Sequence, residues 1–353
     1  MSAIKTTYVG MDLGTFKTSV ASSGGYRDVM QTAVGWPKDH FARTMLGRDV
    51  VFGKDIVDHR LALDVVRPFE KGALKYVDSK AAGLSDNQVE KHALAAKLVI
   101  EYAVNLVHRE HGQPVYGVIG VPSRASLKNK KFIIDAAQNA FDAVAVVAEP
   151  FTIAYGMNRL SDTLVVDIGA GTIDLCPIYG VYPTDEEQIT LPMGGDLIDE
   201  EFEHRLSAKY PNVQFSRNMV REIKERFGFV HDVNEQALVQ LPIDGKPVTL
   251  DVTEPLKGAC KTVLKPIIDA VRQMVSKFDP EFQHKMRHNI ILGGGGSQLK
   301  GLDRMIEAGL SEYGGGKVTR VPDATYAGAV GALKLAMGMP TDGWTKLKEK
   351  SKS

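Results

Sequence analysis

Two carboxylates, Asp12 and Asp167, each follow an apolar run and precede a glycine-containing turn that ends in threonine. The first stretch reads YVGMDLGT and ends at Thr15, and the second reads LVVDIGAGT and ends at Thr172. Backbone N–H groups and a hydroxyl in such a turn bind phosphate oxygens. A carboxylate tolerates phosphates when Mg²⁺ lies between them, bound directly or through its waters. The pair of turns therefore predicts a site for Mg²⁺ and a nucleotide polyphosphate.

The recurrence of this stretch predicts a duplicated fold, because the two copies lie about one domain apart in the sequence. Each β-branched run is typical of a buried strand. Gly14, Gly169 and Gly171 let the backbone approach a ligand closely. Either turn alone could equally be an ordinary strand-to-turn corner, where Asp and Gly are common. Their repetition favours the nucleotide site.

Strands and helices are expected to alternate along the chain, which predicts an α/β fold. Expected strands lie at 4–34 (two, joined through Gly24-Gly25), 115–122, 143–150, 164–168, 173–179 and 289–293. Expected helices lie at 86–111, 123–141, 151–160, 197–209 and 254–278, with a last one after ATYAGAVGAL. The Lys-rich tail from Gly343 lacks apolar periodicity and is expected to be mobile.

Two domains follow from this order. Domain I is expected to comprise residues 1–148 with 326–353, and domain II residues 149–325. Each carries a small inserted subdomain, at about 35–75 and about 195–255. Within the second, Asp244-Gly245 between two strands is typical of a type I′ hairpin turn.

Composition narrows the class of protein. The 353 residues, 44% of them hydrophobic, suffice for a large core. With 43 basic and 43 acidic residues, no charge excess indicates nucleic-acid binding or attachment to a membrane surface. Cys176 and Cys260 form no disulfide framework, which fits a reducing compartment. No apolar run reaches the ~20 residues of a membrane span, and the first residues do not resemble a secretory signal. We expect a cytoplasmic protein.

Further candidate residues lie outside the two turns. Glu149 ends a strand and could orient a water that attacks a phosphate, although it would also stabilise the start of the next helix. The run from Gly293 through Gly294 and Gly295 to Gly296 could lie against adenine or ribose, or be a flexible loop. Lys224 and Glu225 would by themselves be read as a solvated helix face.

Together these motifs resemble the actin, Hsp70 and sugar-kinase superfamily over nearly the whole chain. DLGT and DIGAGTID resemble its two phosphate motifs, AEP and TYAGAVGAL its connecting motifs, and LGGGGSQLKGL its adenosine motif. VREIKERFGF is similar to the actin segment whose Lys-Glu pair contacts the nucleoside, which reverses the reading of Lys224 and Glu225. GGD at 194–196 resembles a turn of the MreB proteins and adds Asp196, as the adenosine motif adds Gln298.

The resemblance implies an actin-like ATPase fold of two ribonuclease-H-like domains with ATP or ADP and Mg²⁺ in a cleft between them. Glu149, Asp167 and Thr172 would take part in catalysis. Asp12 and Asp167 would hold Mg²⁺, with water as the expected bridge, and Thr15 and Gly171 would bind phosphates. Lys17 follows the first turn at a different offset from the actin lysine, so it either contacts phosphate or points outward.

Several stretches are similar to the MamK family of magnetosome filament actins, among them EPFTIAYG and VTEPLKGAC. That family implies an ATP-dependent head-to-tail homopolymer that organises magnetosomes in the cytoplasm, with an adaptor protein as a partner. Three alternatives stay open: a cell-shape actin like MreB, a small-molecule kinase of the same superfamily, and a scaffold that binds ATP without hydrolysing it.

Overall fold

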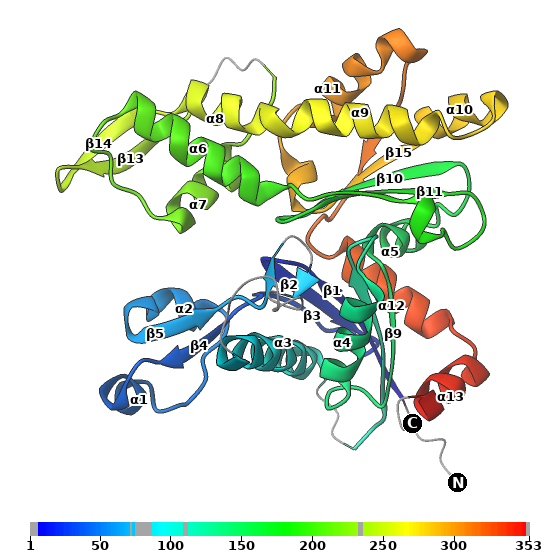
Figure 1. Cartoon of the computed structure of the whole chain (residues 1–353), viewed down its shortest axis with the longest axis horizontal. Helices are drawn as coiled ribbons and strands as arrows, with labels where there is room; N and C mark the ends of the chain where they lie inside the picture. The colour runs from blue at the N-terminus through cyan, green and yellow to red at the C-terminus, as the bar shows by residue number, and fades with distance from the viewer. Residues whose placement is uncertain (1–5, 71–72, 75–85, 109–111, 232–235, 351–353) are drawn as a thin grey trace. The chain divides into compact units, whose positions relative to one another are not determined.

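The computed structural model describes residues 6–70, 73–74, 86–108, 112–231 and 236–350 (Figure 1). The chain forms two compact units: unit 1 comprises residues 1–159 with 325–353, and unit 2 comprises residues 160–324. The helix expected at 86–111 ends at residue 107, and residues 109–111 lie outside the described residues, as do parts of both expected inserted subdomains.

Unit 1 contains a five-stranded sheet in which three antiparallel strands continue into two parallel ones. The segment expected to hold two strands contains the first three, and Gly25, with φ +85°, lies at the predicted turn, between the second and third of them. The strands lie in the order β3 (Arg27–Gln31), β2 (Lys17–Ser22), β1 (Thr7–Leu13), β8 (Val115–Val121) and β9 (Ala143–Ala148). The helices of this unit's main body are α3 (Asp86–Val107), α4 (Leu127–Ala137), α5 (Glu149–Gly156), α12 (Ala327–Gly338) and α13 (Thr341–Lys350).

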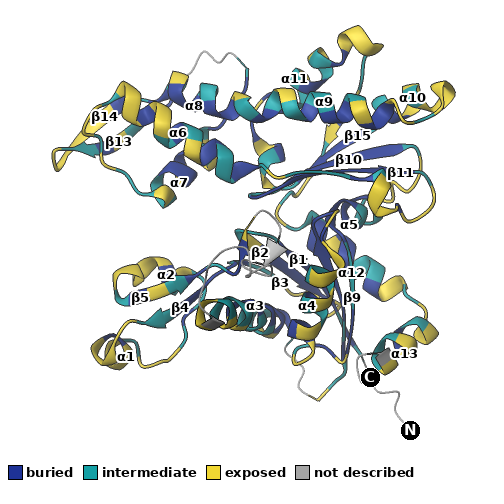
Figure 2. Cartoon of the chain, viewed as in Figure 1, coloured by how far each residue is buried: buried dark blue, intermediate teal, exposed yellow. Residues whose placement is uncertain are grey.

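Helices cover both faces of this sheet because side chains alternate between the faces of β1. Val9 and Met11 belong to a core shared with α3 and α4. Tyr8 belongs to a second cluster, with α12 and α13. A Cβ on Gly10 would overlap the backbone of α12, so helix and strand are in direct contact there. The two central strands β1 and β8 are accordingly buried along most of their length (Figure 2).

A small layer follows β3 in unit 1. Its four strands form two antiparallel pairs, and Ala33, Val51, Ile56 and Leu63 form a core of their own. Its elements are β4 (Val34–Pro37), α1 (His40–Leu46), α2 (Lys54–Asp58), the 3₁₀ turn η1 (Arg60–Ala62), β5 (Leu63–Val66), β6 (Phe69–Glu70) and β7 (Ala73–Leu74).

Unit 2 repeats the sheet of unit 1, again with three antiparallel strands continuing into two parallel ones. This repetition confirms the predicted duplicated α/β fold. The order is β12 (Ile189–Leu191), β11 (Ile173–Ile178), β10 (Thr163–Ile168), β15 (Ile290–Gly293) and β16 (Val318–Arg320). The helices are α6 (Gly195–Lys209), α7 (Arg217–Phe227), α8 (Thr253–Cys260), α9 (Leu264–Val275), α10 (Pro280–Arg287) and α11 (Leu302–Gly309).

The core of unit 2 joins one face of the sheet to its helices. Leu164, Val166 and Ile168 of β10 lie in it with Phe202 of α6 and Ile267 of α9. These three β10 positions share one face because side chains alternate along a strand. The neighbouring Asp167 therefore belongs to the opposite face of the same sheet.

A hairpin of β13 (Leu238–Ile243) and β14 (Lys246–Asp251) extends from this unit. Its two-residue loop, Asp244-Gly245, has φ +51° and +78°. Positive φ at both loop positions is the requirement of a type I′ turn, so the turn predicted from these two residues is confirmed.

The C-terminal tail differs from its prediction. Residues Thr341–Lys350 form α13, and Trp344 is only 1% exposed. Its ring stacks on Tyr116 with centroids 5.1 Å apart and lies 6.2 Å from Tyr8. The expectation of a mobile tail is wrong up to Lys350, because Trp344 and the partly buried Leu347, three residues apart on one face of the helix, pack in the cluster beneath it. Residues 351–353 lie outside the described residues.

The long helix expected at 254–278 is also wrong in part. It is divided into α8 and α9 by the 3₁₀ turn η4 (Lys261–Val263). Pro266, at the third position of α9, has no N–H for the carbonyl four residues earlier, and its ring crowds that carbonyl. The helix is interrupted there. Among the described residues, no helix is long and apolar enough to cross a membrane.

Candidate functional site

Asp12 is the last residue but one of β1, and three elements of unit 1 surround its carboxylate. Its register partner on β8 is Gly120, where a Cβ would stand 3.2 Å from Cγ of Glu149. Glu149, the first residue of α5, is 7% exposed and shares a side-chain hydrogen bond with Asp12. A Cβ on Gly328, at the start of α12, would overlap Oδ2 of Asp12. Unit 1 thus brings the two predicted carboxylates together beside a helix N-terminus, which favours negative charge.

Burial raises the pKa of Asp12 to about 6, and the hydrogen bond with Glu149 lowers it only in part. A carboxylate in such a site ionises more readily when a cation approaches. The environment of Asp12 is therefore suited to a cation ligand.

The first glycine turn follows Asp12 directly. The carbonyl of Gly14 accepts a hydrogen bond from the Thr32 hydroxyl at 2.8 Å. Thr15 is the next residue of this turn, and Lys17 is the exposed first residue of β2. The Lys17 ammonium lies 5.9 Å from the ring centre of Phe16. The turn itself therefore holds Gly14 and Thr15, whereas Lys17 already belongs to the following strand.

Asp167 repeats the position of Asp12 in unit 2. It is the last residue but one of β10, and its register partner on the neighbouring parallel strand is Gly293, as that of Asp12 is Gly120. Asp167 is 6% exposed, and Thr172 beyond the turn is also buried. The sheet topology thus gives both carboxylates the same setting.

The start of α6 supports the second glycine turn. Within the turn, the Gly169 N–H donates to the carbonyl of Thr172 at 2.9 Å. The N–H groups of Gly195 and Asp196 donate to the carbonyls of Gly169 and Ala170 at 3.0 and 2.8 Å. Gly171 lies between these braced positions. The backbone N–H of Asp196 therefore stabilises the conformation of the turn.

The glycine run after β15 is an ordered turn, η5 (Gly295–Gln298). The Ser297 hydroxyl donates to the carbonyl of Gly294 at 2.7 Å and accepts from the Gln298 amide at 3.1 Å. Gly294 has φ +71°, and a Cβ on it would overlap Oδ1 of Asp167. This close approach requires glycine and places the run beside the carboxylate.

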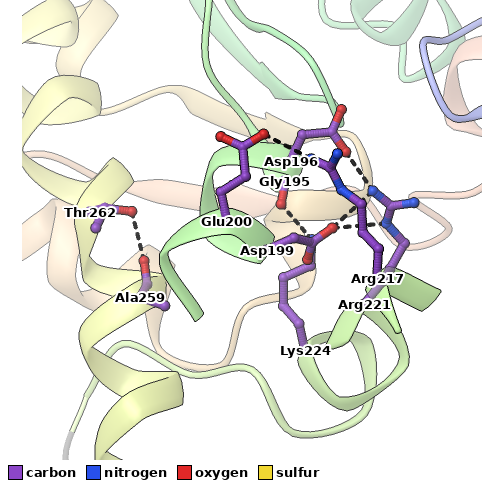
Figure 3. Close-up of polar contacts among 9 residues, drawn as sticks. All are labelled: Gly195, Asp196, Asp199, Glu200, Arg217, Arg221, Lys224, Ala259 and Thr262. Atoms are coloured by element: carbon purple, nitrogen blue, oxygen red, sulfur yellow. Dashed lines mark hydrogen bonds and ion pairs between the residues drawn. The ribbon is translucent and has the colours of Figure 1, made fainter. Parts of the chain in front are cut away.

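Lys224 reaches from α7 to the start of α6, the segment that braces the second glycine turn (Figure 3). Its ammonium donates to the carbonyl of Gly195 at 2.7 Å and pairs with Asp199 at 2.6 Å. A Cβ on Gly195 would stand 3.0 Å from this ammonium nitrogen and 3.6 Å from Cα of Ala170. The ammonium therefore lies close to the turn, whereas the next residue, Glu225, is exposed.

Arg221 and Asp199, which the sequence analysis did not identify, belong to the same group of charged side chains. Arg221 donates through Nε to Asp199 at 2.9 Å and through Nη2 to Asp196 at 2.5 Å. Asp196 and Asp199 are three residues apart on α6, as Arg221 and Lys224 are on α7. Residues at this spacing share a helix face. Matching acidic and basic pairs are the sequence signal that could have identified them.

The described residues hold no cluster of three or more His, Cys, Asp or Glu side chains that could bind a metal. Mg²⁺ usually takes one or two carboxylates together with waters and substrate phosphates. Asp12 in unit 1 and Asp167 in unit 2 each lie next to a glycine turn, and a single carboxylate of this kind is enough for that mode of binding.

Comparison with known proteins gives consistent matches. Residues 6–338 match the family model of the MreB/Mbl proteins. The actin-like protein MamK of Paramagnetospirillum magneticum is 36% identical over 346 residues, which cover 98% of this chain and 96% of that protein. A solved MamK double helical filament is 35% identical with a TM-score of 0.89, covering 95% of this chain and all of the filament chain.

A second structure, a non-polymerising MamK mutant bound to AMPPNP, is 36% identical with a TM-score of 0.72, at the same coverages. The chain belongs to the MreB/Mbl family and has the actin-like fold. Within that family its sequence is similar to the actin-like MamK proteins, as the motifs predict.

Proposed function

We propose that this protein is an actin-like ATPase that binds ATP with Mg²⁺ and polymerises into cytoplasmic filaments. The observation that carries the proposal is the repeated setting of Asp12 and Asp167, each at the end of a buried strand, opposite a glycine and before a phosphate-type turn. The similar MamK structures, one a filament and one bound to AMPPNP, support it.

In this proposal the two glycine turns bind the phosphates, through Thr15 in unit 1 and through Gly171 and Thr172 in unit 2. Asp12 and Asp167 would hold Mg²⁺, which would supply positive charge against the phosphates. The ordered turn of η5 receives the adenosine.

Glu149 orients the water that attacks the terminal phosphate. Its carboxylate is nearly buried and lies against Asp12, so its position is restricted before any ligand binds. Phosphoryl transfer depends mainly on positioning and electrostatics, which such a fixed carboxylate supplies. A proton can pass from the water to Glu149 during attack.

Nucleotide binding and assembly are coupled in this proposal. A nucleotide shifts a conformational equilibrium only by binding one state better than the other. Here ATP favours the state that polymerises, and hydrolysis weakens the contacts between subunits. Subunits that add head to tail make a heterologous contact, which gives an open filament.

Ultracentrifuge pelleting tests this function. We expect the wild type to sediment with ATP and Mg²⁺, and to remain soluble with ADP or without nucleotide. Glu149→Ala and the isosteric Glu149→Gln are expected to pellet with ATP and to release phosphate at least tenfold more slowly. Equal phosphate release by all three proteins would refute the role of Glu149, and no sedimentation under any condition would refute the filament.

The cellular role we propose is to position magnetosomes through an adaptor protein. A fluorescent fusion of this chain, expressed in a magnetosome-forming cell that lacks its own MamK, should form a line along the magnetosome chain. Diffuse fluorescence with scattered magnetosomes would refute this role. Phosphorylation of a small-molecule acceptor with rapid turnover would instead favour the kinase alternative.

A further inference from the structure

Asp199 is a fully buried carboxylate that binds two cations from another helix (Figure 3). Its Oδ1 lies 2.6 Å from Nζ of Lys224, and its Oδ2 lies 2.9 Å from Nε of Arg221. Each oxygen thus holds a different side chain. A single carboxylate on α6 therefore sets the positions of two basic groups on α7.

The group as a whole is neutral. Arg221, whose side chain is 6% exposed, also pairs with Asp196, and the four side chains comprise two acids and two bases. Asp196 lies next to the second glycine turn, since its N–H donates to the carbonyl of Ala170. An unpaired carboxylate there would repel phosphate. Arg221 removes this repulsion, which leaves Lys224 to act on a ligand.

One N–H group of the Lys224 ammonium is available to a ligand. An ammonium group has three N–H donors; the carbonyl of Gly195 accepts a hydrogen bond from one, and the ion pair with Oδ1 of Asp199 occupies the side of a second. In the part of unit 2 that the structure describes, these are the two polar partners of Lys224. Because the ammonium lies beside the second glycine turn, its third N–H remains for an oxygen of a ligand bound at that turn.

We propose that Asp199 is a positioning residue of the nucleotide site, which holds Lys224 so that its remaining N–H reaches an oxygen of the nucleotide. This inference rests on the nucleotide binding proposed above. A lysine side chain loses considerable rotamer freedom when it is fixed. Asp199 and Gly195 restrict Lys224 before the nucleotide arrives, and such preorganisation increases affinity.

A double-mutant cycle tests the proposal. AMPPNP with Mg²⁺ is titrated by calorimetry into the full-length wild type, Asp199→Asn, Lys224→Met and the double variant. Each protein is used at a concentration at which it does not pellet in the ultracentrifuge. We expect Kd to rise about tenfold in each single variant, as for the loss of one good contact. The double variant should bind no more weakly than Lys224→Met, because Asp199 acts through Lys224.

A purely structural role for Asp199 predicts a different pattern. It would lower the thermal stability and leave the Kd of the folded protein unchanged, or add to the effect of Lys224→Met. Either result overturns the proposal. Wild-type protein that fails to bind AMPPNP overturns the proposed function as well, whereas tight wild-type binding with unaffected variants overturns this inference alone.

Two further variants keep the test decisive. Glu200→Gln is the matched control, because Glu200 pairs with Arg217 at 2.8 Å between the same two helices but is exposed; its Kd should equal that of the wild type. If Asp199→Asn does not fold, Gly195→Ala replaces it, since the added Cβ would stand 3.0 Å from Nζ of Lys224. An unchanged Kd for Gly195→Ala would then overturn the proposal.

Discussion

Asp12 and Gly328 lie so close together that a single added methyl group on Gly328 would overlap the Asp12 carboxylate. We therefore predict that Gly328→Ala displaces Asp12 and weakens AMPPNP binding at least tenfold. Overpacking of this kind also costs about 1–3 kcal/mol of stability. Calorimetric titration and urea unfolding would measure the two effects.

Val330→Ala is the control for this substitution, because Val330 lies on the same helix but is 43% exposed. It should leave nucleotide affinity unchanged. If Gly328→Ala binds as tightly as the control, the carboxylate of Asp12 does not depend on this contact.

The raised pKa of Asp12 predicts a pH-dependent stability. Asp12 keeps its proton up to about pH 6 in the folded chain but loses it near its ordinary pKa of 3.8 when unfolded. Stability therefore falls as the pH rises between these values, and the cost is fully present above pH 6. Asp12→Asn should stabilise the nucleotide-free protein by up to about 3 kcal/mol near neutral pH. Urea unfolding would show a smaller gain at about pH 5; an equal gain at both values would contradict the assignment.

Both thiols should be unreactive in the folded protein. Burial, with the nearby charges of Asp174 and Glu187, raises the pKa of Cys176 well above its ordinary range, and burial raises the pKa of Cys260 to about 11. Because the thiolate is the nucleophile, an aromatic disulfide reagent at about pH 8 should label neither cysteine in minutes. Both should react in denaturant. Labelling of either one in the native protein would contradict this prediction.

The buried tryptophan of α13 predicts that the C-terminal helix contributes to stability. Trp344→Ala removes the ring that stacks on Tyr116, and loss of a buried aromatic side chain costs about 3–5 kcal/mol. Lys346→Ala, on the exposed side of the same helix, is the control. Urea unfolding of both variants would measure the cost. Equal stabilities of Trp344→Ala and Lys346→Ala would contradict the predicted contribution of α13.

Local features of the fold could be predicted because nearby residues decide them. Asp244 and Gly245 adopt the positive φ values of a type I′ turn, and the residues that end each β-branched run form the expected strand ends. The carboxylates Asp12 and Asp167 could be found for the same reason, since a repeated strand and turn are visible in the chain itself. The break before α9 also had a local signal in Pro266, which the periodicity of the apolar residues obscured.

The duplicated α/β order, the two glycine turns and the carboxylate before each of them could be predicted from the chain alone. The folded structure was needed to show that Glu149 lies against Asp12, that Asp199 holds Lys224 and Arg221, and that Trp344 stacks on Tyr116. Strand and turn preferences act over a few neighbouring residues. Contacts such as these join residues far apart in the chain, and they depend on how helices pack against a completed sheet.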